Sequence, residues 1–356
     1  MPATRLPLVV TSDSALLDDL LRLAAAGGTK VDVAPDPAAA RPRYVIAPLV
    51  MIGADQLDAC LRARLPRRSR VAVVARGEVS DRVWKAAHTH GADHVAELPV
   101  AEGWVIDRFA ELLDQPVGRV LAVIGGRGGA GASTLAAAVA ATAAGDRRRS
   151  LLIDADPLGG GLDLMFGWER RDGLRWSALA DADGRVDPPA LLGALPGDGD
   201  LVLLSFDRSA GLSLPAEAMA STIDAARRAR DVTVIDLPRR LDDAAVLALE
   251  CADQAVLIVP AEVRASAAAA RVVAMVRMHR HDLSLVVRGP SPGNLRAGDV
   301  ASALKLPLVG TLRPEQAVTH AAEHGLSPGA DGKGPLALLC RRLLDDLLGD
   351  AAAVAA

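Results

Sequence analysis

The sequence has few aromatic residues, few cysteines and no long apolar run. Aromatic residues make up 2% of its 356 residues, which is too little for the base-stacking surface of single-stranded nucleic-acid binders. The three cysteines, at 60, 251 and 340, form no C-x-x-C pair, so we expect free thiols in a reducing compartment. No apolar stretch reaches the ~20 residues that span a bilayer, and the N-terminus lacks the pattern of a signal peptide. We therefore expect a cytoplasmic protein.

The excess of charge is also small. The net charge is −4, with 51% hydrophobic and 24% charged residues, which argues against a disordered chain and against a general polyanion-binding surface. The length corresponds to roughly two domains of about 150 residues each. A proline- and glycine-containing linker near 114–118 separates them. We predict two doubly wound α/β domains with parallel sheets, at 1–115 and 119–349, and a flexible tail at 350–356.

The first predicted domain alternates five short strands with helices, which indicates a parallel sheet covered on both faces. This order resembles the receiver domains of response regulators, in which an aspartate at the end of the third strand is phosphorylated. Here we expect that strand at Tyr44–Ala47, followed by Pro48, so the acceptor position has no carboxylate. Ala75 and Leu98-Pro99 replace the expected hydroxyl and Lys-Pro, and only Asp13 remains of the Mg²⁺-binding acids. We predict a pseudo-receiver that is not phosphorylated and either docks partners or has a merely structural role.

The second predicted domain begins with a hydrophobic strand, a glycine-rich turn and an alanine-rich helix, which is the layout of a phosphate-binding loop. The pattern G-x-x-x-x-G-K-[ST] fits, except that Ala132 stands at the lysine position. A cradle of backbone N–H groups at a helix N-terminus remains, and such a cradle can hold an anion. The predicted nucleotide contacts in this loop are Gly126, Arg127, Gly128, Gly129, Ala130, Gly131, Ala132, Ser133 and Thr134.

The same turn has two other interpretations. Its glycines also spell the dinucleotide fingerprint G-x-G-x-x-G, and Asp154 ends the next strand where that fingerprint places the acid that binds ribose. An ordinary glycine-rich turn is the plainest alternative, although so many glycines weaken packing unless a ligand or backbone approaches closely. The triphosphate loop is favoured over both, because Ser133 and Thr134 offer adjacent hydroxyls for Mg²⁺ and phosphate.

Carboxylates at two strand ends predict a Mg²⁺ site. Asp156 follows the strand at 150–153, and Asp236 ends the strand at 231–236 in the place of a Walker-B acid. These two aspartates are the predicted catalytic residues, and with the hydroxyl of Ser133 they are the predicted Mg²⁺ ligands. Further polar residues follow the last two strands at the edge where doubly wound folds bind ligands. The predicted border of a base pocket comprises Arg288, Pro314 and Glu315.

Four segments together resemble the MinD/ParA superfamily of deviant Walker-A ATPases: RGGAGAST, DADPLGGGLDLMFGWERR, DLP and ADQAVLIVPAEV. The resemblance covers 119–349. A pseudo-receiver ahead of a lysine-less loop is similar to the CpaE/TadZ branch, and most of all to the actinobacterial CpaE-like septum site-determining proteins. The resemblance implies ATP and Mg²⁺ as cofactors, a homodimer formed on ATP binding, and a role in placing the division septum or a Tad-type pilus and secretion apparatus. It also implies that Arg127 replaces the signature lysine that crosses the dimer interface.

The missing lysine predicts little turnover. It removes a cation from the charge that develops in phosphoryl transfer, a loss that commonly costs ~10²–10³ in rate. We expect nucleotide occupancy to control dimerisation and the docking of division or pilus-secretion proteins through the pseudo-receiver, at the septum or a cell pole. A genuine slow ATPase is the alternative, because Asp156 and Asp236 are retained. A dinucleotide-binding oxidoreductase is the alternative from another class, although the histidines of the second domain lie outside the strand-end loops.

Two further partners are not expected. Residues 335–349 carry an apolar stripe, but their balanced charges favour a helix that packs on the core, so membrane association is at most indirect. Short arginine clusters at 62–70, 147–149 and 227–230 are typical of solvated helix ends. Without a recognisable reading helix, they do not predict DNA binding.

Overall fold

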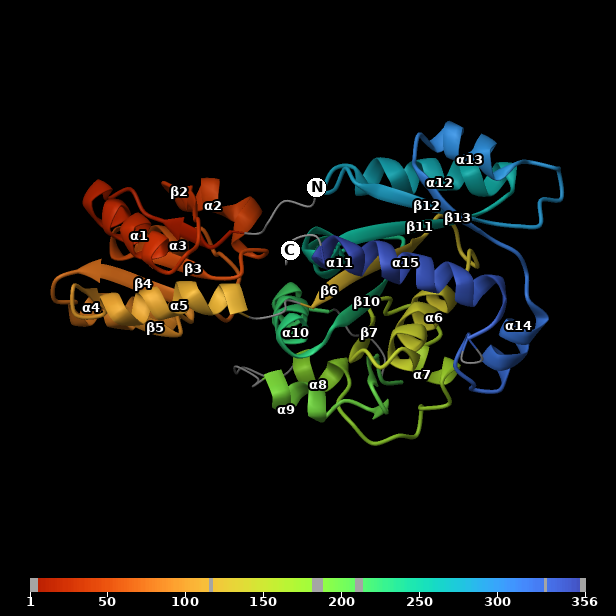
Figure 1. Cartoon of the computed structure of the whole chain (residues 1–356), viewed down its shortest axis with the longest axis horizontal. Coiled ribbons are helices and arrows are strands. Elements are labelled where there is room, and N and C mark those ends of the chain that lie inside the picture. The colour runs from red at the N-terminus through yellow and green to blue at the C-terminus, as the bar shows by residue number, and fades with distance from the viewer. Residues whose placement is uncertain (1–5, 115–117, 181–187, 209–213, 330–331, 353–356) are drawn as a thin grey trace. The chain divides into compact units, whose positions relative to one another are not determined.

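The first sheet has five parallel strands in the order β2-β1-β3-β4-β5. The computed structural model describes residues 6–114, 118–180, 188–208, 214–329 and 332–352. The chain divides near residue 116 into two compact units, each with its own sheet (Figure 1). The strands of the first unit are apolar runs because helices cover both of their faces. They are β1 (Leu8–Val10), β2 (Asp32–Ala34), β3 (Val50–Gly53), β4 (Val71–Arg76) and β5 (His94–Leu98).

Two helices pack on one face of this sheet and three on the other, each group around its own apolar cluster. The first group is α1 (Ser14–Ala26) and α5 (Glu102–Asp114). The second group is α2 (Pro37–Tyr44), α3 (Ala54–Arg62) and α4 (Asp81–His90). The strand order and the two covered faces are those of a doubly wound receiver-like fold, as the sequence predicted.

The third strand lies later in the chain than the sequence predicted. Tyr44 ends helix α2, and the third strand is β3, at Val50–Gly53. The helix forms because the side chain of Asp36 caps its first turn, accepting a hydrogen bond of 2.9 Å from a backbone N–H, and Pro37 suits the first helical position. The predicted position of the third strand was therefore wrong, and the correct position brings Asp55, two residues after β3, to the carboxyl edge of the sheet.

The second sheet has eight strands in the order β13-β12-β11-β6-β10-β7-β9-β8. All neighbours are parallel except β8 and β9 at one edge. The strands β7 to β10 lie on one side of β6, and the chain then crosses to the other side at β11. The turn after β6 therefore lies at a topological switch point, where ligands bind in such folds. The strands are β6 (Arg119–Gly125), β7 (Ser150–Asp154), β8 (Gly197–Asp198), β9 (Leu201–Leu204), β10 (Val232–Leu237), β11 (Gln254–Pro260), β12 (Leu283–Arg288) and β13 (Leu308–Leu312).

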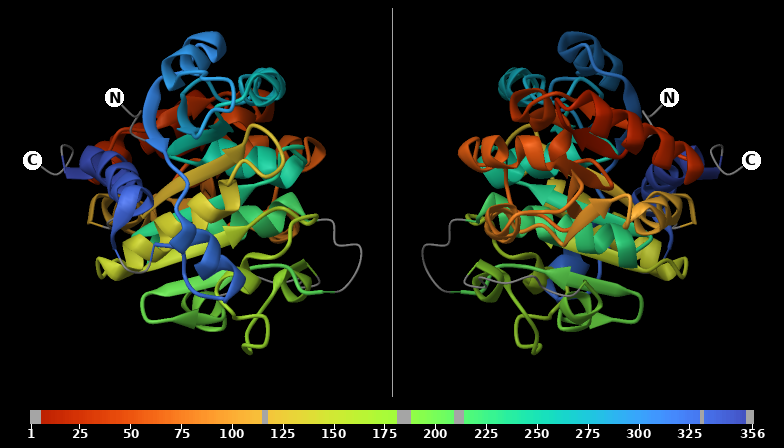
Figure 2. Two further views of the ribbon diagram at one scale, coloured as in Figure 1. Left: turned by 90° about the vertical axis from the view of Figure 1, so that its right-hand side faces the viewer. Right: turned by 90° about the vertical axis from the view of Figure 1, so that its left-hand side faces the viewer.

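Helices cover both faces of this sheet as well (Figure 2). One face carries α6 (Ala132–Gly145) and α15 (Gly334–Ala352). The other is covered by α10 (Ala216–Ala229), α11 (Asp243–Cys251) and α12 (Val263–Val276). The remaining helices lie in the connections: α7 (Leu162–Met165), α8 (Trp176–Ala180), α9 (Pro188–Gly193), α13 (Ala297–Leu304) and α14 (Gln316–Glu323). The two parallel-sheet α/β domains confirm the predicted fold class.

The last helix packs on the core. Leu336, Leu339, Leu343 and Leu347 are all buried in the cluster around α6, which confirms the core-packing interpretation. The helix continues to Ala352, three residues into the predicted tail, and 353–356 lie outside the described residues. Among the described residues, no helix combines the length and apolar character needed to cross a bilayer.

Candidate functional site

The turn between β6 and α6, which we call the glycine loop (residues 126–131), has the shape of an anion cradle. Gly129 and Gly131 have φ values of 71° and 100°, a region that favours glycine. A Cβ on Gly126 would lie 2.8 Å from side-chain atoms of Val259 and Ala269, so only glycine lets the loop pack this closely on β11 and α12. No side chain caps the start of α6, which leaves its first N–H groups available to an anion.

Two buried aspartates stand side by side behind this loop. Asp236 on β10 pairs in register with Asp154 on β7, and its carboxylate shares a hydrogen bond with the side chain of Ser133. Burial, with a smaller contribution from the charges of Asp154 and Asp156, raises the pKa of Asp236 to about 7, although the hydrogen bond with Ser133 lowers it. Burial also raises the pKa of Asp154 to about 6. Buried carboxylates that repel one another in this way form an environment that a cation would stabilise.

Asp154 shapes the loop that follows β7. Its carboxylate accepts hydrogen bonds from the backbone N–H groups of Asp156 at 3.2 Å and Leu162 at 3.0 Å, and its backbone carbonyl accepts one from Trp176 Nε1 at 2.7 Å. Asp156 itself is half-buried, and its Oδ1 accepts a hydrogen bond from the N–H of Leu158 at 3.0 Å. Sequence reasoning missed this organising role of Asp154, because only the folded loop brings the second N–H, eight residues further on, to its carboxylate.

The predicted Mg²⁺ ligands are brought together in part. Ser133 and Asp236 share a hydrogen bond, and Asp156 lies close enough for its charge to raise the pKa of Asp236. Within the described residues, no group of three or more His, Cys, Asp or Glu side chains could hold a metal ion. Mg²⁺ takes six oxygen ligands and keeps several waters. These residues therefore fit a Mg²⁺ ion that arrives with phosphate oxygens rather than one held by protein alone.

Arginines, rather than a lysine, surround the glycine loop. Arg127 in the loop donates to Glu262 Oε1 at 2.7 Å. Arg288, predicted to border a base pocket, instead donates from Nη2 to the carbonyl of Gly129 at 3.1 Å. It thus braces the backbone of the loop from the end of β12.

The predicted Pro314–Glu315 turn follows β13, and Glu315 points elsewhere. Its Oε1 accepts a hydrogen bond from the N–H of Leu336 at 2.6 Å, near the start of α15. The structure therefore gives Glu315 a role in anchoring the last helix and does not bring its carboxylate to the glycine loop.

The carboxyl edge of the first sheet also carries an acid, Asp55. Its carboxylate accepts hydrogen bonds from Thr11 Oγ1 at 2.8 Å, from the N–H and hydroxyl of Ser12 at 2.8 and 2.9 Å, and from Gln56 Nε2 at 3.1 Å. Burial would raise the pKa of Asp55, but these hydrogen bonds together hold it below its ordinary value. Asp13, expected as a remnant of a Mg²⁺ site, caps helix α1 by accepting from two backbone N–H groups. Both carboxylates therefore make hydrogen bonds within the first domain.

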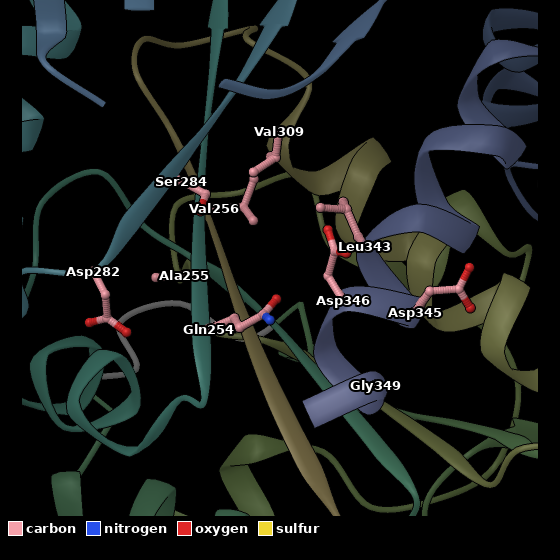
Figure 3. Close-up of a pocket in the computed structure, with 10 residues that line it drawn as sticks. All are labelled: Gln254, Ala255, Val256, Asp282, Ser284, Val309, Leu343, Asp345, Asp346 and Gly349. Atoms are coloured by element: carbon pink, nitrogen blue, oxygen red, sulfur yellow. The ribbon is translucent and has the colours of Figure 1, made fainter. Parts of the chain in front are cut away.

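One cavity lies at the opposite edge of the second sheet from the glycine loop. It has a volume of 450 Å³ and lies between the amino ends of β11 and β12 and helix α15 (Figure 3). Three of the side chains that line it are the carboxylates of Asp282, Asp345 and Asp346. These would repel a polyphosphate, and ligands of doubly wound sheets bind at the carboxyl edge, so we assign the site to the glycine loop.

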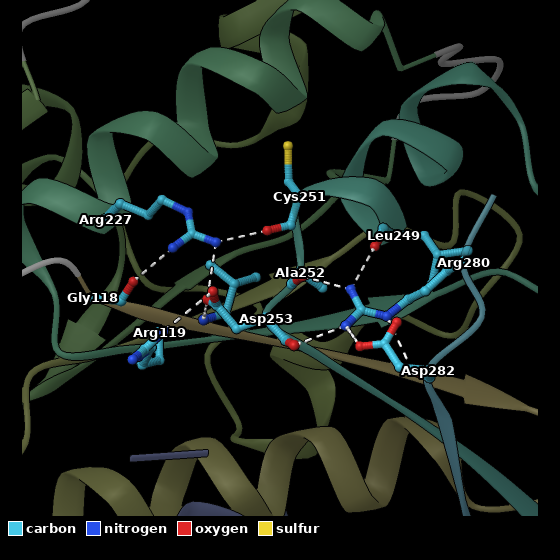
Figure 4. A network of polar contacts seen from close by, with 10 residues as sticks. Gly118, Arg119, Arg227, Leu249, Cys251, Ala252, Asp253, Arg280 and Asp282 are labelled. Carbon is cyan, nitrogen blue, oxygen red and sulfur yellow. Dashed lines mark hydrogen bonds and ion pairs between the residues drawn. The ribbon is translucent and has the colours of Figure 1, made fainter. Parts of the chain in front are cut away.

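Arginines hold the amino edge of the sheet together, and Figure 4 shows Arg227, from a predicted cluster, and Arg280, from outside the clusters. Arg227 donates to the carbonyl of Gly118 at 3.1 Å and to Asp253 Oδ2 at 2.9 Å. Arg280 reaches the carbonyls of Ala252 at 2.6 Å and Asp253 at 2.8 Å. Arg149 likewise pairs with Asp231 at 2.9 Å. These guanidinium groups are engaged within the domain.

Comparison with known proteins assigns both domains. The family model described as "Rv3660c-like, CheY-like N-terminal domain" matches residues 10–120. Over 320 residues, the chain is 42% identical to the uncharacterized protein Rv3660c of Mycobacterium tuberculosis, covering 88% of this chain and 90% of that one. It is 28% identical to a putative septum site-determining protein MinD of Emiliania huxleyi over 218 residues, which are 58% of this chain and 78% of that protein.

The fold of the second domain also matches a solved structure. A ParA family ATPase from Chlorobium tepidum superposes with a TM-score of 0.57 at 16% identity, covering 65% of this chain and 99% of that one. The chain thus has a CheY-like N-terminal domain followed by a MinD/ParA-like domain.

Proposed function

This chain belongs to the Rv3660c-like family, and we propose that it is a spatial regulator that binds ATP with Mg²⁺ and hydrolyses it slowly or not at all. One observation carries the proposal. The glycine loop keeps its backbone cradle and lies against buried carboxylates with raised pKa values, but Ala132 takes the place of the lysine. The site can therefore bind a phosphate chain and a cation while lacking one charge that speeds phosphoryl transfer.

Each part of the site has a defined task in this proposal. The backbone N–H groups from Gly126 to Thr134 would hold the phosphates, and Ser133, Asp156 and Asp236 would orient Mg²⁺ and its water. When bound, Mg²⁺ would neutralise phosphate charge. Asp154 keeps the loop that carries Asp156 in position through its two backbone hydrogen bonds.

Exposed apolar side chains at the same edge support a homodimer formed on ATP binding. Leu158, in the loop after Asp156, is 94% exposed, and Val263, next to the Glu262 that pairs with Arg127, is 74% exposed. A second copy placed over the glycine loop would cover them and remove apolar area from water. The nucleotide would then decide whether the dimer exists.

The relatives support a proposal for the regulated process. One relative is a MinD protein that carries the name septum site-determining, so we propose placement or inhibition of the division septum. Localisation of a Tad-type pilus or secretion apparatus at a pole, as in the CpaE/TadZ branch, is the other form of the same role. In both, the CheY-like domain would dock partner proteins through its surface, because its Asp55 is already occupied by internal hydrogen bonds.

Two alternatives differ in their support. A genuine slow ATPase of the same class is favoured by the presence of both Asp156 and Asp236 near Ser133. A dinucleotide-binding oxidoreductase is disfavoured, because Asp154, which should bind ribose, is buried and accepts two backbone hydrogen bonds instead.

Calorimetric titration with ATP, ADP and NAD, each with Mg²⁺, tests the proposal. We expect both adenine nucleotides to bind and NAD to give no signal. The variant Gly131→Val serves as the control, because a β-branched residue does not adopt the φ of 100° found there. No uptake of ATP at millimolar concentration would overturn the proposal. Steady turnover at the rate of ordinary MinD proteins, abolished by Asp156→Ala, would favour the ATPase instead.

A further inference from the structure

Three arginines approach the glycine loop, and their partners differ. Arg127 is neutralised by Glu262 at 2.7 Å. Arg288, from the end of β12, already donates to the carbonyl of Gly129 at 3.1 Å. The third, Arg239, follows β10, two residues after the Leu237 that ends that strand. Because Ala132 stands at the lysine position, a nearby cation without a partner of its own would add to the attraction of the loop for phosphate.

Arg239 lies against the outer turn of the glycine loop. A Cβ built on Gly128 would be 3.6 Å from Arg239 Nη2 and 3.8 Å from its Cζ. The side chain is exposed, and within the described parts of the chain it forms no hydrogen bond or ion pair. Its guanidinium group is therefore charged, close to the loop and available.

The sheet order explains why this residue is there. Strand β10 is the direct neighbour of β6, so the residues that follow β10 lie beside the loop that follows β6. The same strand end thus delivers two groups, with Asp236 behind the loop beside Ser133 and Arg239 at its outer turn. The DLP motif ends at 238, and nothing in the sequence alone marks the next residue as part of the site.

We propose that Arg239 is the phosphate-binding cation that stands in for the missing lysine of this loop. The inference rests on the proposed function, namely that the loop binds a polyphosphate. A guanidinium group stays charged at all relevant pH values and can grip two phosphate oxygens at once. It reaches the phosphates from the flank of the loop, whereas a lysine at 132 would reach them from the first turn of α6. Arg239 would therefore bind phosphate, but from a different position than a lysine at 132.

The test compares Mg²⁺–ATP binding by the full-length protein and three variants. Arg239→Gln removes the charge, and the double variant Arg239→Gln with Ala132→Lys returns a cation at the original place. Arg240→Gln is the matched control, because Arg240 is the adjacent residue and is also exposed. We expect Arg239→Gln to weaken ATP binding by about 10- to 100-fold, as for loss of one hydrogen bond between charged groups. We expect Arg240→Gln to change binding by less than about twofold, and the double variant to regain most of the loss.

The outcomes separate the two claims. If the wild type binds ATP and Arg239→Gln binds equally well, the inference fails while the proposed function stands. Equal losses in Arg239→Gln and Arg240→Gln would show a general effect of surface charge and would also overturn it. A double variant that stays weak would refute the exchange of roles with the lysine. If the wild type binds no ATP, both claims fall. Thermal unfolding of each variant establishes that its fold is intact.

Discussion

The two sheets carry acids at equivalent edges, yet they treat them in opposite ways. In the CheY-like domain, Asp55 is surrounded by hydrogen-bond donors from Thr11, Ser12 and Gln56, which hold its pKa below its ordinary value. In the MinD/ParA-like domain, burial and mutual repulsion raise the pKa of Asp154 to about 6 and that of Asp236 to about 7. The carboxylate at the first edge has hydrogen-bond donors from its own domain, whereas the carboxylates at the second edge would be stabilised by a cation.

This difference distinguishes a carboxylate with a structural role from carboxylates suited to binding a ligand. A carboxylate that the fold supplies with enough donors keeps its charge without help and has little to gain from a metal ion. Carboxylates that are buried together with fewer donors store an electrostatic cost, which a bound cation can relieve. The comparison therefore supports the proposal that the second domain binds the nucleotide, whereas the acid at the edge of the first domain already has internal partners.

The largest effect is expected at Asp154. Asp154→Ala should lower the free energy of unfolding by about 2 to 4 kcal/mol, because the buried N–H groups of Asp156 and Leu162 lose their acceptor. Denaturant unfolding followed by hydrogen exchange across 150–168 would measure the loss and place it. Asp156→Ala, at a half-buried position, is the control and should cost less than about 1 kcal/mol. Equal costs would show that Asp154 does not organise this loop.

The next prediction tests whether the buried charge of Asp236, behind the glycine loop, lowers the stability of the folded domain. Because its folded-state pKa of about 7 is raised, Asp236 favours folding most below its ordinary pKa, and this contribution is lost as the pH rises towards 7. Asp236→Asn mimics the protonated form. Between about pH 4 and 7, the free energy of unfolding of the variant should therefore fall less than that of the wild type. Above pH 7 the variant should be more stable than the wild type by on the order of 2 kcal/mol.

Urea unfolding at several pH values measures this effect in the second domain, with hydrogen exchange to assign the transition. Asp154 titrates with the same sign, so some pH dependence should remain in the variant. A variant that is less stable than the wild type at pH 8 would contradict the view that the hydrogen bond of Asp236 does not offset the cost of burying its charge.

The first domain should respond with the opposite sign. The lowered pKa of Asp55 means that its charged form stabilises the fold above its ordinary pKa, and that this contribution is lost as the pH falls through the folded-state value. Asp55→Asn should therefore be less stable at pH 7, by about 1 kcal/mol, and the difference should shrink in acid. Hydrogen exchange in 8–13 and 50–62 would report it. If Asp55→Asn instead raised the free energy of unfolding at pH 7, the carboxylates at the edges of the two sheets would not differ in the way described above.

Much of this contrast could be predicted from the sequence, and the rest depended on how the chain folds. The glycine loop and Asp236 were found because their motifs are local and follow apolar strands. Asp55 was missed because the apolar run near Tyr44 was taken for a strand, whereas the Asp36 cap makes it a helix. The neighbours of the loop, Arg239 and Arg288, come from strands more than 100 residues away. Only the sheet order brings them together.

The smallest effect concerns an ion pair beside the glycine loop, formed by Arg127 and Glu262. Both side chains are 36% exposed, so their ion pair contributes only about 0.2 to 1 kcal/mol to stability. Glu262→Gln should hardly change unfolding, but it should free Arg127 and tighten Mg²⁺–ATP binding about two- to threefold at low salt, an effect that fades as salt screens the charge. Glu250→Gln, which removes an exposed carboxylate paired with His279, should leave binding unchanged. Weaker binding by Glu262→Gln would mean that the ion pair holds the glycine loop in its binding shape. The edge of the second sheet would then depend on contacts within its own domain, as the edge of the first sheet does.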